Sequence, residues 1–108
     1  MPEPPTTLGD LSELVRAKNA GPFWLTLDVF LRDDAAYRRV TDAGAVTPRS
    51  VARAYRVPAD TIRVFELPDL RVIKVSFPRA VGQGSLQDRD MHSGQQHVPL
   101  ANLPVEDG

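Results

Sequence analysis

The sequence predicts an α+β domain with a small mixed β-sheet of three or four strands, about three helices packed mainly on one face, and a long ordered C-terminal loop. Two observations lead to this fold class. Segments with apolar residues at helical spacing are interspersed with segments in which apolar and polar residues alternate. The connection between the first two strand candidates is also long enough to hold two helices and cross over the sheet.

The chain is expected to begin with a tail and a helix. Residues 1–9 are rich in proline and polar residues, which predicts a disordered N-terminal tail. Asp10 is suited to be a helix N-cap, and Gly21 and Pro22 can end a helix. The apolar face of this helix would be formed by Leu11, Leu14 and Val15. We therefore expect a short helix from Asp10 to the Gly-Pro pair.

The clearest strand pattern lies in residues 23–31, FWLTLDVFL. The side chains that must face the core are Phe23, Leu25, Leu27, Val29 and Leu31. The side chains on the other face are Trp24, Thr26, Asp28 and Phe30. Because two large aromatic residues bracket an acid there, the pattern favours a face that is half covered, or covered by a partner chain.

Two helices are expected next. The first begins at Asp33 or Asp34 and ends at Gly44, a residue suited to the left-handed C-cap. The second begins at Thr47–Pro48, which combines an N-cap threonine with proline at the first helical position. It ends at residues 57–60 (VPAD), since the residue before a proline disfavours helix.

The remaining segments are predicted to be a hairpin and a loop. Residues 61–67 and 71–77 alternate like strands and flank a turn. After them comes a long segment with few apolar residues, in which we expect an ordered loop and a short extended piece near 95–101. The predicted domain therefore covers residues 10–101, and residues 102–108 form a C-terminal tail.

The overall composition excludes several classes of protein. The 108 residues are a typical length for one domain that folds without disulfides or metal. The formal net charge of −1 argues against a nucleic-acid partner, and no apolar run is long enough to span a bilayer. The chain has no cysteine, and its N-terminus lacks the features of a signal peptide. We therefore expect a cytoplasmic domain without a nucleic-acid or membrane partner and without a cofactor.

The first candidate site lies at the end of the first predicted helix. Lys18 would project from the inner face of that helix, and Asn19 and the backbone of Gly21 follow at once. A carboxylate would find a positive charge, an amide and a backbone N–H close together. The alternative is purely structural, since a lysine near a helix C-terminus also complements the helix dipole.

The second candidate site is the segment DRDMHSGQQH. Its potential metal ligands are Asp88, Asp90, His92 and His97. Their spacing matches no established ligand pattern, so no metal site is predicted. A general acid-base role for His97 is favoured over a metal, with Gln95 and Gln96 to orient a substrate. In the structural alternative, these side chains only satisfy the backbone of the loop.

Two weaker signals follow the last strand. Residues 82–85 (GQGS) could form an anion-binding nest, but they lack the ending of a phosphate-binding P-loop. Arg79, which precedes them, is the better residue for an anionic ligand. No nucleophile elbow or dinucleotide fingerprint is present.

Four segments together resemble a known family: LVRAKNAGPFWLTLDVFL, AGAVTPRSVARAYRVPAD, VIKVSFPR and DMHSGQQHVPL. This family is the small domain of unknown function found beside, or fused to, AtuA-type acyclic terpene utilisation proteins. The resemblance covers about residues 10–101. It implies functional positions at Lys18, Asn19, Gly21, Pro22, Thr26, Asp28, Lys74, Pro78, Arg79, Asp90, Gln95, Gln96 and His97. His92 stands where the family pattern has an aromatic residue such as tyrosine, which further weakens a metal site.

The resemblance implies a role in the catabolism of carboxylic acids or their acyl-CoA thioesters, as a small subunit or accessory domain of an AtuA-like protein. In this hypothesis Lys18, Asn19 and Arg79 bind the anion, while Gln96 and His97 face a cleft shared with the large protein. The resemblance assigns no reaction to the small domain itself.

Two alternatives to the accessory role remain at this point. In one, the chain is a stand-alone hydratase or lyase that uses His97 as the acid-base group and Lys18 as the carboxylate anchor. In the other, it is a homo-oligomeric structural or ligand-sensing domain whose Trp24 and Phe30 face is a contact between subunits.

Overall fold

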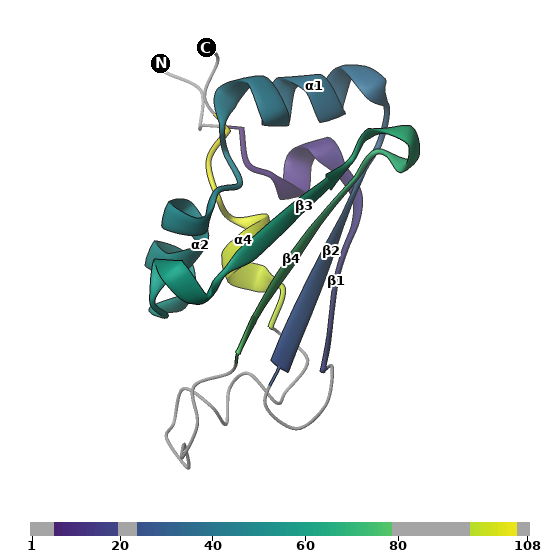
Figure 1. Ribbon diagram of the computed structural model, residues 1–108. Coiled ribbons are helices and arrows are strands. Elements are labelled where there is room, and N and C mark those ends of the chain that lie inside the picture. The colour runs from purple at the N-terminus through teal and green to yellow at the C-terminus, as the bar shows by residue number, and fades with distance from the viewer. Residues whose placement is uncertain (1–5, 20–23, 79–95, 106–108) are drawn as a thin grey trace.

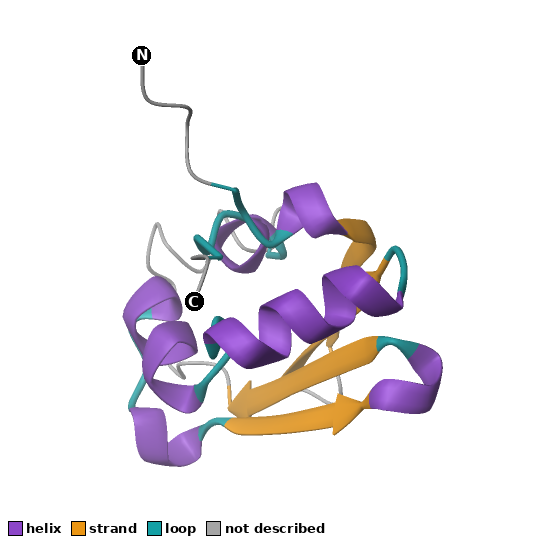
Figure 2. Ribbon diagram, turned by 90° about the horizontal axis from the view of Figure 1, so that it is seen from above, coloured by secondary structure: helices purple, strands orange, loops and turns teal. Residues whose placement is uncertain are grey.

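The computed structural model describes residues 6–19, 24–78 and 96–105. Its sheet consists of β1 (Ser12–Asn19), β2 (Trp24–Leu31), β3 (Arg63–Leu67) and β4 (Val72–Pro78). The helices are α1 (Asp34–Ala43), α2 (Pro48–Tyr55) and α4 (Val98–Ala101), with short 3-10 turns η1 (Gly9–Leu11), η2 (Ala59–Thr61) and η3 (Pro68–Leu70). The helices lie together on one face of the sheet, as Figures 1 and 2 show. The α+β class predicted from the sequence is confirmed.

The sheet is antiparallel throughout, so the expectation of a mixed sheet is wrong. The strand order is β1-β2-β4-β3, and each neighbouring pair is antiparallel. The connection through α1 and α2 does cross over the sheet, because β2 and β3 run in the same direction. However, β4 folds back from the η3 turn and inserts between them, so the two parallel strands never become neighbours.

The first predicted helix is in fact an edge strand. Among the described residues before Ser12, the helical part is the three-residue turn η1. Strand β1 then pairs with β2 from Ser12 opposite Leu31 to Asn19 opposite Leu25. Thr7 and Asp10 form reciprocal hydrogen bonds before this strand: the Thr7 N–H donates to Asp10 Oδ2 over 2.9 Å, and the Asp10 N–H donates to Thr7 Oγ1 over 3.3 Å. The backbone hydrogen bond from Thr7 is the main cause of the lowered pKa of Asp10.

Helix α1 begins and ends, and α2 begins, where the capping residues predict. Helix α2 ends at Tyr55, with Arg56 as its left-handed C-cap, just before the predicted residues 57–60. Asp33 accepts a hydrogen bond from the Ala36 N–H at the start of α1, and Gly44 ends α1 in the left-handed conformation at φ 62°. Thr47 and Ser50 form a capping box at the start of α2. These local signals therefore define the helix termini, while core packing holds the helices against the sheet.

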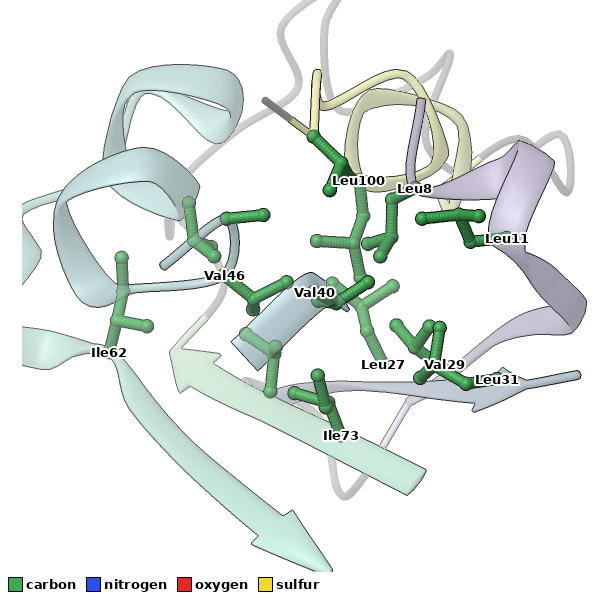
Figure 3. Close-up of a cluster of buried hydrophobic side chains, with 14 of the residues drawn as sticks. Leu8, Leu11, Leu27, Val29, Leu31, Val40, Val46, Ile62, Ile73 and Leu100 are labelled. Atoms are coloured by element: carbon green, nitrogen blue, oxygen red, sulfur yellow. The ribbon is translucent and has the colours of Figure 1, made fainter. Parts of the chain in front are cut away.

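One continuous core lies between the helices and the sheet. Figure 3 shows side chains of β2 and β4 meeting those of α1 and of both chain ends. The fully or almost fully buried side chains of this cluster include Leu8, Leu27, Val29, Val40, Val51, Ile73, Val75 and Leu100. All core residues of the central strands come from one face of the sheet, which leaves the second face outside this cluster.

The two ends of the described chain lie side by side. The Leu8 N–H donates to the carbonyl of Leu103, and the Val105 N–H donates to the carbonyl of Thr6, both over 2.8 Å. Leu8 is 0% exposed and Val105 is 3% exposed. Residues 6–9 and 102–105, which the sequence analysis assigned to tails, therefore contribute to the fold.

The C-terminal segment also differs from expectation. The extended piece expected near residues 95–101 is instead the short helix α4, which packs near α2 and η1. The long ordered loop expected after β4 falls on residues 79–95, which lie outside the described residues. No helix in the described part of the chain is long and apolar enough to cross a membrane.

Candidate functional site

The face of the sheet opposite the described helices, called the open face here, carries three rows of residues matched across all four strands. The apolar row consists of Leu14, Phe30, Val72 and Leu67. The charged row consists of Arg16, Asp28, Lys74 and Phe65. The hydroxyl row consists of Lys18, Thr26, Ser76 and Arg63. Because side chains alternate along a strand, all twelve project from the same face.

The apolar row and its surroundings expose large hydrophobic side chains. Leu14 is 49% exposed on β1, and Leu67 is 37% exposed on β3. Phe65, in the neighbouring row, is 46% exposed, and Trp24 is 39% exposed further along β2. Four such residues on one sheet face form the kind of apolar surface that marks an interaction site.

The charged row is centred on a buried carboxylate. The Asp28 side chain is only 6% exposed, although it lies on the open face. Arg16 donates to its Oδ2 over 3.4 Å, and Lys74 Nζ lies 3.9 Å from its Oδ1. Within the described residues Oδ1 accepts no hydrogen bond. The Arg16 guanidinium also lies over the Phe30 ring, 5.2 Å from its centroid, and so joins the charged row to the apolar row.

Replacing Asp28 by asparagine should lower the free energy of unfolding by about 1 kcal/mol. The two cations would lose their counter-charge, but both are about half exposed, so water would compensate for much of the loss. Urea unfolding at neutral pH measures the effect. Asp34→Asn is the matched control, since its pair with Arg71 is exposed on both sides. Equal stability of the Asp28 and Asp34 variants would contradict a structural role for the charged row.

The hydroxyl row differs from the charged row because it contains no acidic residue. Lys18 and Arg63 lie at its two ends, are exposed, and form no ion pair within the described residues. Between them Thr26 is 9% exposed and Ser76 is half-buried. Neither hydroxyl makes a hydrogen bond in the part of the chain that the structure describes.

Comparison with protein families identifies the chain. The model of a family described as Domain of unknown function (DUF4387) matches residues 8–104, which is most of the sequence. The chain is a DUF4387 domain. The match agrees with the sequence resemblance in pointing to a small domain of unknown function. Neither the search of curated proteins nor the search of solved structures gave a match.

Within this DUF4387 domain, Lys18 and Asn19 lie at the end of a strand rather than at the end of a helix. Lys18 is opposite Thr26 and Asn19 is opposite Leu25 in the pairing of β1 with β2. The helix-dipole explanation for Lys18 therefore does not apply. Lys18 and Asp28 share the open face, as the alternation of strand residues requires, whereas Asn19 belongs to the other side of β1.

Gln96 and His97 belong to a segment packed on the helix-covered side of the sheet. The Tyr55 hydroxyl donates to the carbonyl oxygen of Gln96 over 2.7 Å, and the Tyr55 ring lies 5.2 Å from that of Phe77, centroid to centroid. Gln96 is buried, and His97 is half-buried at the start of α4. The structure therefore does not bring these two residues onto the open face with Lys18 and Asp28.

Three other predicted site residues, namely Arg79, Asp90 and Gln95, lie outside the described residues. The same holds for Asp88, His92 and the segment 82–85. Among the described residues, no three His, Cys, Asp or Glu side chains are grouped so that they could hold a metal ion.

Sequence reasoning missed Arg16, Arg63 and Tyr55. Arg16 was read as part of a helix, and Arg63 as one residue of an ordinary strand. Arg16 becomes a candidate only through its pairing with Asp28 of β2, and Arg63 only through its pairing with Ser76 of β4. The one local signal was the alternation of residues 14–18, which places Leu14, Arg16 and Lys18 on one face if the segment is a strand.

Proposed function

We propose that this DUF4387 domain is a small accessory subunit of an AtuA-like protein and that it docks through the open face of its sheet. The observation that carries the proposal is the apolar row, which no helix of the described chain covers. Leu14 and Leu67, at its two ends, are 49% and 37% exposed. Burying such a half-apolar sheet face against a partner removes apolar surface from water and therefore stabilises the complex.

The charge of the open face favours a different protein over a second copy of this chain. Its three rows contain the basic residues Arg16, Lys18, Arg63 and Lys74, against the single acid Asp28. Packing two such faces together would bring like charges into contact, which opposes association. An acidic surface with apolar patches would be complementary, and we assign that surface to the AtuA-like partner.

In this proposal the domain helps to form a site for a carboxylic acid or an acyl-CoA in catabolism. The resemblance to AtuA-associated domains supplies the ligand class, and Lys18 on the open face is the residue that supports it. The stand-alone enzyme is less well supported, because Lys18 projects from the open face whereas the segment of His97 packs on the helix-covered side of the sheet.

Alanine at Leu14 or at Leu67 should each weaken the complex about tenfold, because each removes an exposed apolar anchor from the docking surface. The measurement is co-expression with the AtuA-like protein, co-elution in size-exclusion chromatography, and calorimetric titration of purified components. Val98→Ala is the matched control, since Val98 is also 37% exposed but lies on α4.

The wild-type domain should co-elute with the large protein, and Val98→Ala should bind like wild type. Separate elution of the wild-type proteins at micromolar concentrations would overturn the accessory role. Equal weakening by Val98→Ala would show that docking does not use the open face. Self-association of the isolated domain, lost in the Leu14 variant, would favour the homo-oligomer instead.

A further inference from the structure

The hydroxyl row has the composition of an anion-binding site. Thr26 and Ser76 are direct neighbours on the two central strands, and their hydroxyls make no hydrogen bond within the described residues. Lys18 flanks Thr26 on β1, and Arg63 flanks Ser76 on β3. With strands spaced by about 4.8 Å, the two basic residues stand about 14 Å apart at their Cα atoms, with both hydroxyls between them. Their long side chains can therefore reach over the hydroxyls from opposite sides.

We infer that the hydroxyl row binds an oxyanion, either a carboxylate or a phosphate group, over Thr26 and Ser76. The hydroxyls donate hydrogen bonds to the anion, while Lys18 and Arg63 supply positive charge from either side. Arg63 suits this role because its planar guanidinium pairs with either kind of oxyanion through two parallel hydrogen bonds. This inference rests on the proposed function for its biological role, but the site itself belongs to the isolated domain.

The neighbouring charged row explains why the anion is assigned to the hydroxyl row. Arg16 and Lys74 already share the buried carboxylate of Asp28, at 3.4 Å and 3.9 Å. An added anion there would meet a negative charge. Lys18 and Arg63 have no such competitor in the described chain, so their charge is available to a ligand.

The position of the hydroxyl row also fits the docking model. The apolar row lies toward the η3 turn, whereas the hydroxyl row lies toward Asn19, Trp24 and Pro78, where three strand termini meet (Figure 1). A partner held by the apolar row would therefore leave the anion at the other end of the same face. Arg79 follows Pro78 directly in the sequence.

The test is a titration of the purified domain at constant ionic strength, monitored by two-dimensional NMR. Chloride is the reference anion. Coenzyme A is the phosphate-bearing probe and acetate is the carboxylate probe. We expect saturable shifts at Thr26, Ser76 and the Arg63 side chain with at least one probe, and the stronger probe identifies the group that the site prefers. The double variant Lys18→Ala/Arg63→Ala should weaken this binding at least about tenfold.

The control is the double variant Arg38→Ala/Arg53→Ala, which removes the same charge from exposed positions on α1 and α2. It should keep the wild-type affinity. Absence of saturable shifts with both probes, or equal weakening in both double variants, would overturn the site. A domain that binds the anion but does not dock would overturn the proposed function alone, and docking without anion binding would overturn this inference alone.

Discussion

Replacing Leu8 by alanine should lower the free energy of unfolding by about 3 kcal/mol, within the range measured for buried leucines. Leu8 is 0% exposed and lies among core side chains of both chain ends, close to Leu11 and Leu100 (Figure 3). Its N–H also donates to the carbonyl of Leu103, which holds the backbone in place, so the neighbours are poorly able to close the cavity. Urea-induced unfolding, monitored by circular dichroism, measures this change in the free energy of unfolding.

Leu70→Ala serves as the control for this prediction. Leu70 is 67% exposed in the η3 turn, so its truncation should change stability by less than about 0.5 kcal/mol. A Leu8 variant as stable as the Leu70 variant would mean that the N-terminal segment does not belong to the core in solution.

The two central helices could be predicted because their signals are local. Asp33, Gly44 and Thr47 act within one turn of the helix they cap, and each is read directly from the sequence. The alternation in β2 was equally local and correctly separated the core face from the open face. Features that depend on a few neighbouring residues could therefore be predicted from the sequence alone.

The edge strand β1 could not be predicted in this way. Leu11, Leu14 and Val15 fit a helix, but Leu14 projects from the open face and Val15 from the core face. The deciding interaction is pairing with β2, which would otherwise present its own backbone as an unprotected edge. That pairing is a tertiary contact, so it overrides a weak local preference.

The candidate site depends on register, which the sequence does not specify. Lys18, Asp28 and Lys74 were identified as functional candidates, Lys74 through the resemblance alone, but Arg16 and Arg63, their neighbours across the sheet, were not. The hydroxyl row exists only because β4 inserts between β2 and β3 and places Ser76 beside Thr26. A mixed sheet and a helix in place of β1 were expected from the sequence, so neither the antiparallel insertion of β4 nor the edge strand was predicted.

The Tyr55 hydroxyl is the main polar connection between α2 and the C-terminal segment. It donates to the carbonyl of Gln96 over 2.7 Å and accepts from the Leu100 N–H over 3.1 Å. His97, at the N-cap of α4, makes no side-chain capping bond. Tyr55 thus satisfies a helix N–H that an N-cap side chain would normally satisfy, and it does so from another helix.

Replacing Tyr55 by phenylalanine should therefore lower the free energy of unfolding by about 2 kcal/mol at neutral pH, since a buried carbonyl and a buried N–H both lose their partner. The ring contact with Phe77 would remain, which separates the hydroxyl effect from packing. Tyr37→Phe is the matched control, because the Tyr37 hydroxyl makes no hydrogen bond within the described residues. It should change stability much less.

The pH dependence of stability gives an independent test of the same hydroxyl. Burial raises the pKa of Tyr55 above its ordinary value near 10, so the folded state retains the phenol proton more strongly than the unfolded chain does. This contribution to stability is complete below about pH 10 and is lost as the pH rises further, because the unfolded chain ionises first. Between pH 9 and pH 11, wild type should therefore lose about 1.4 kcal/mol more than Tyr55→Phe. Parallel pH profiles for the two proteins would show that the Tyr55 hydroxyl is accessible to water rather than buried against α4.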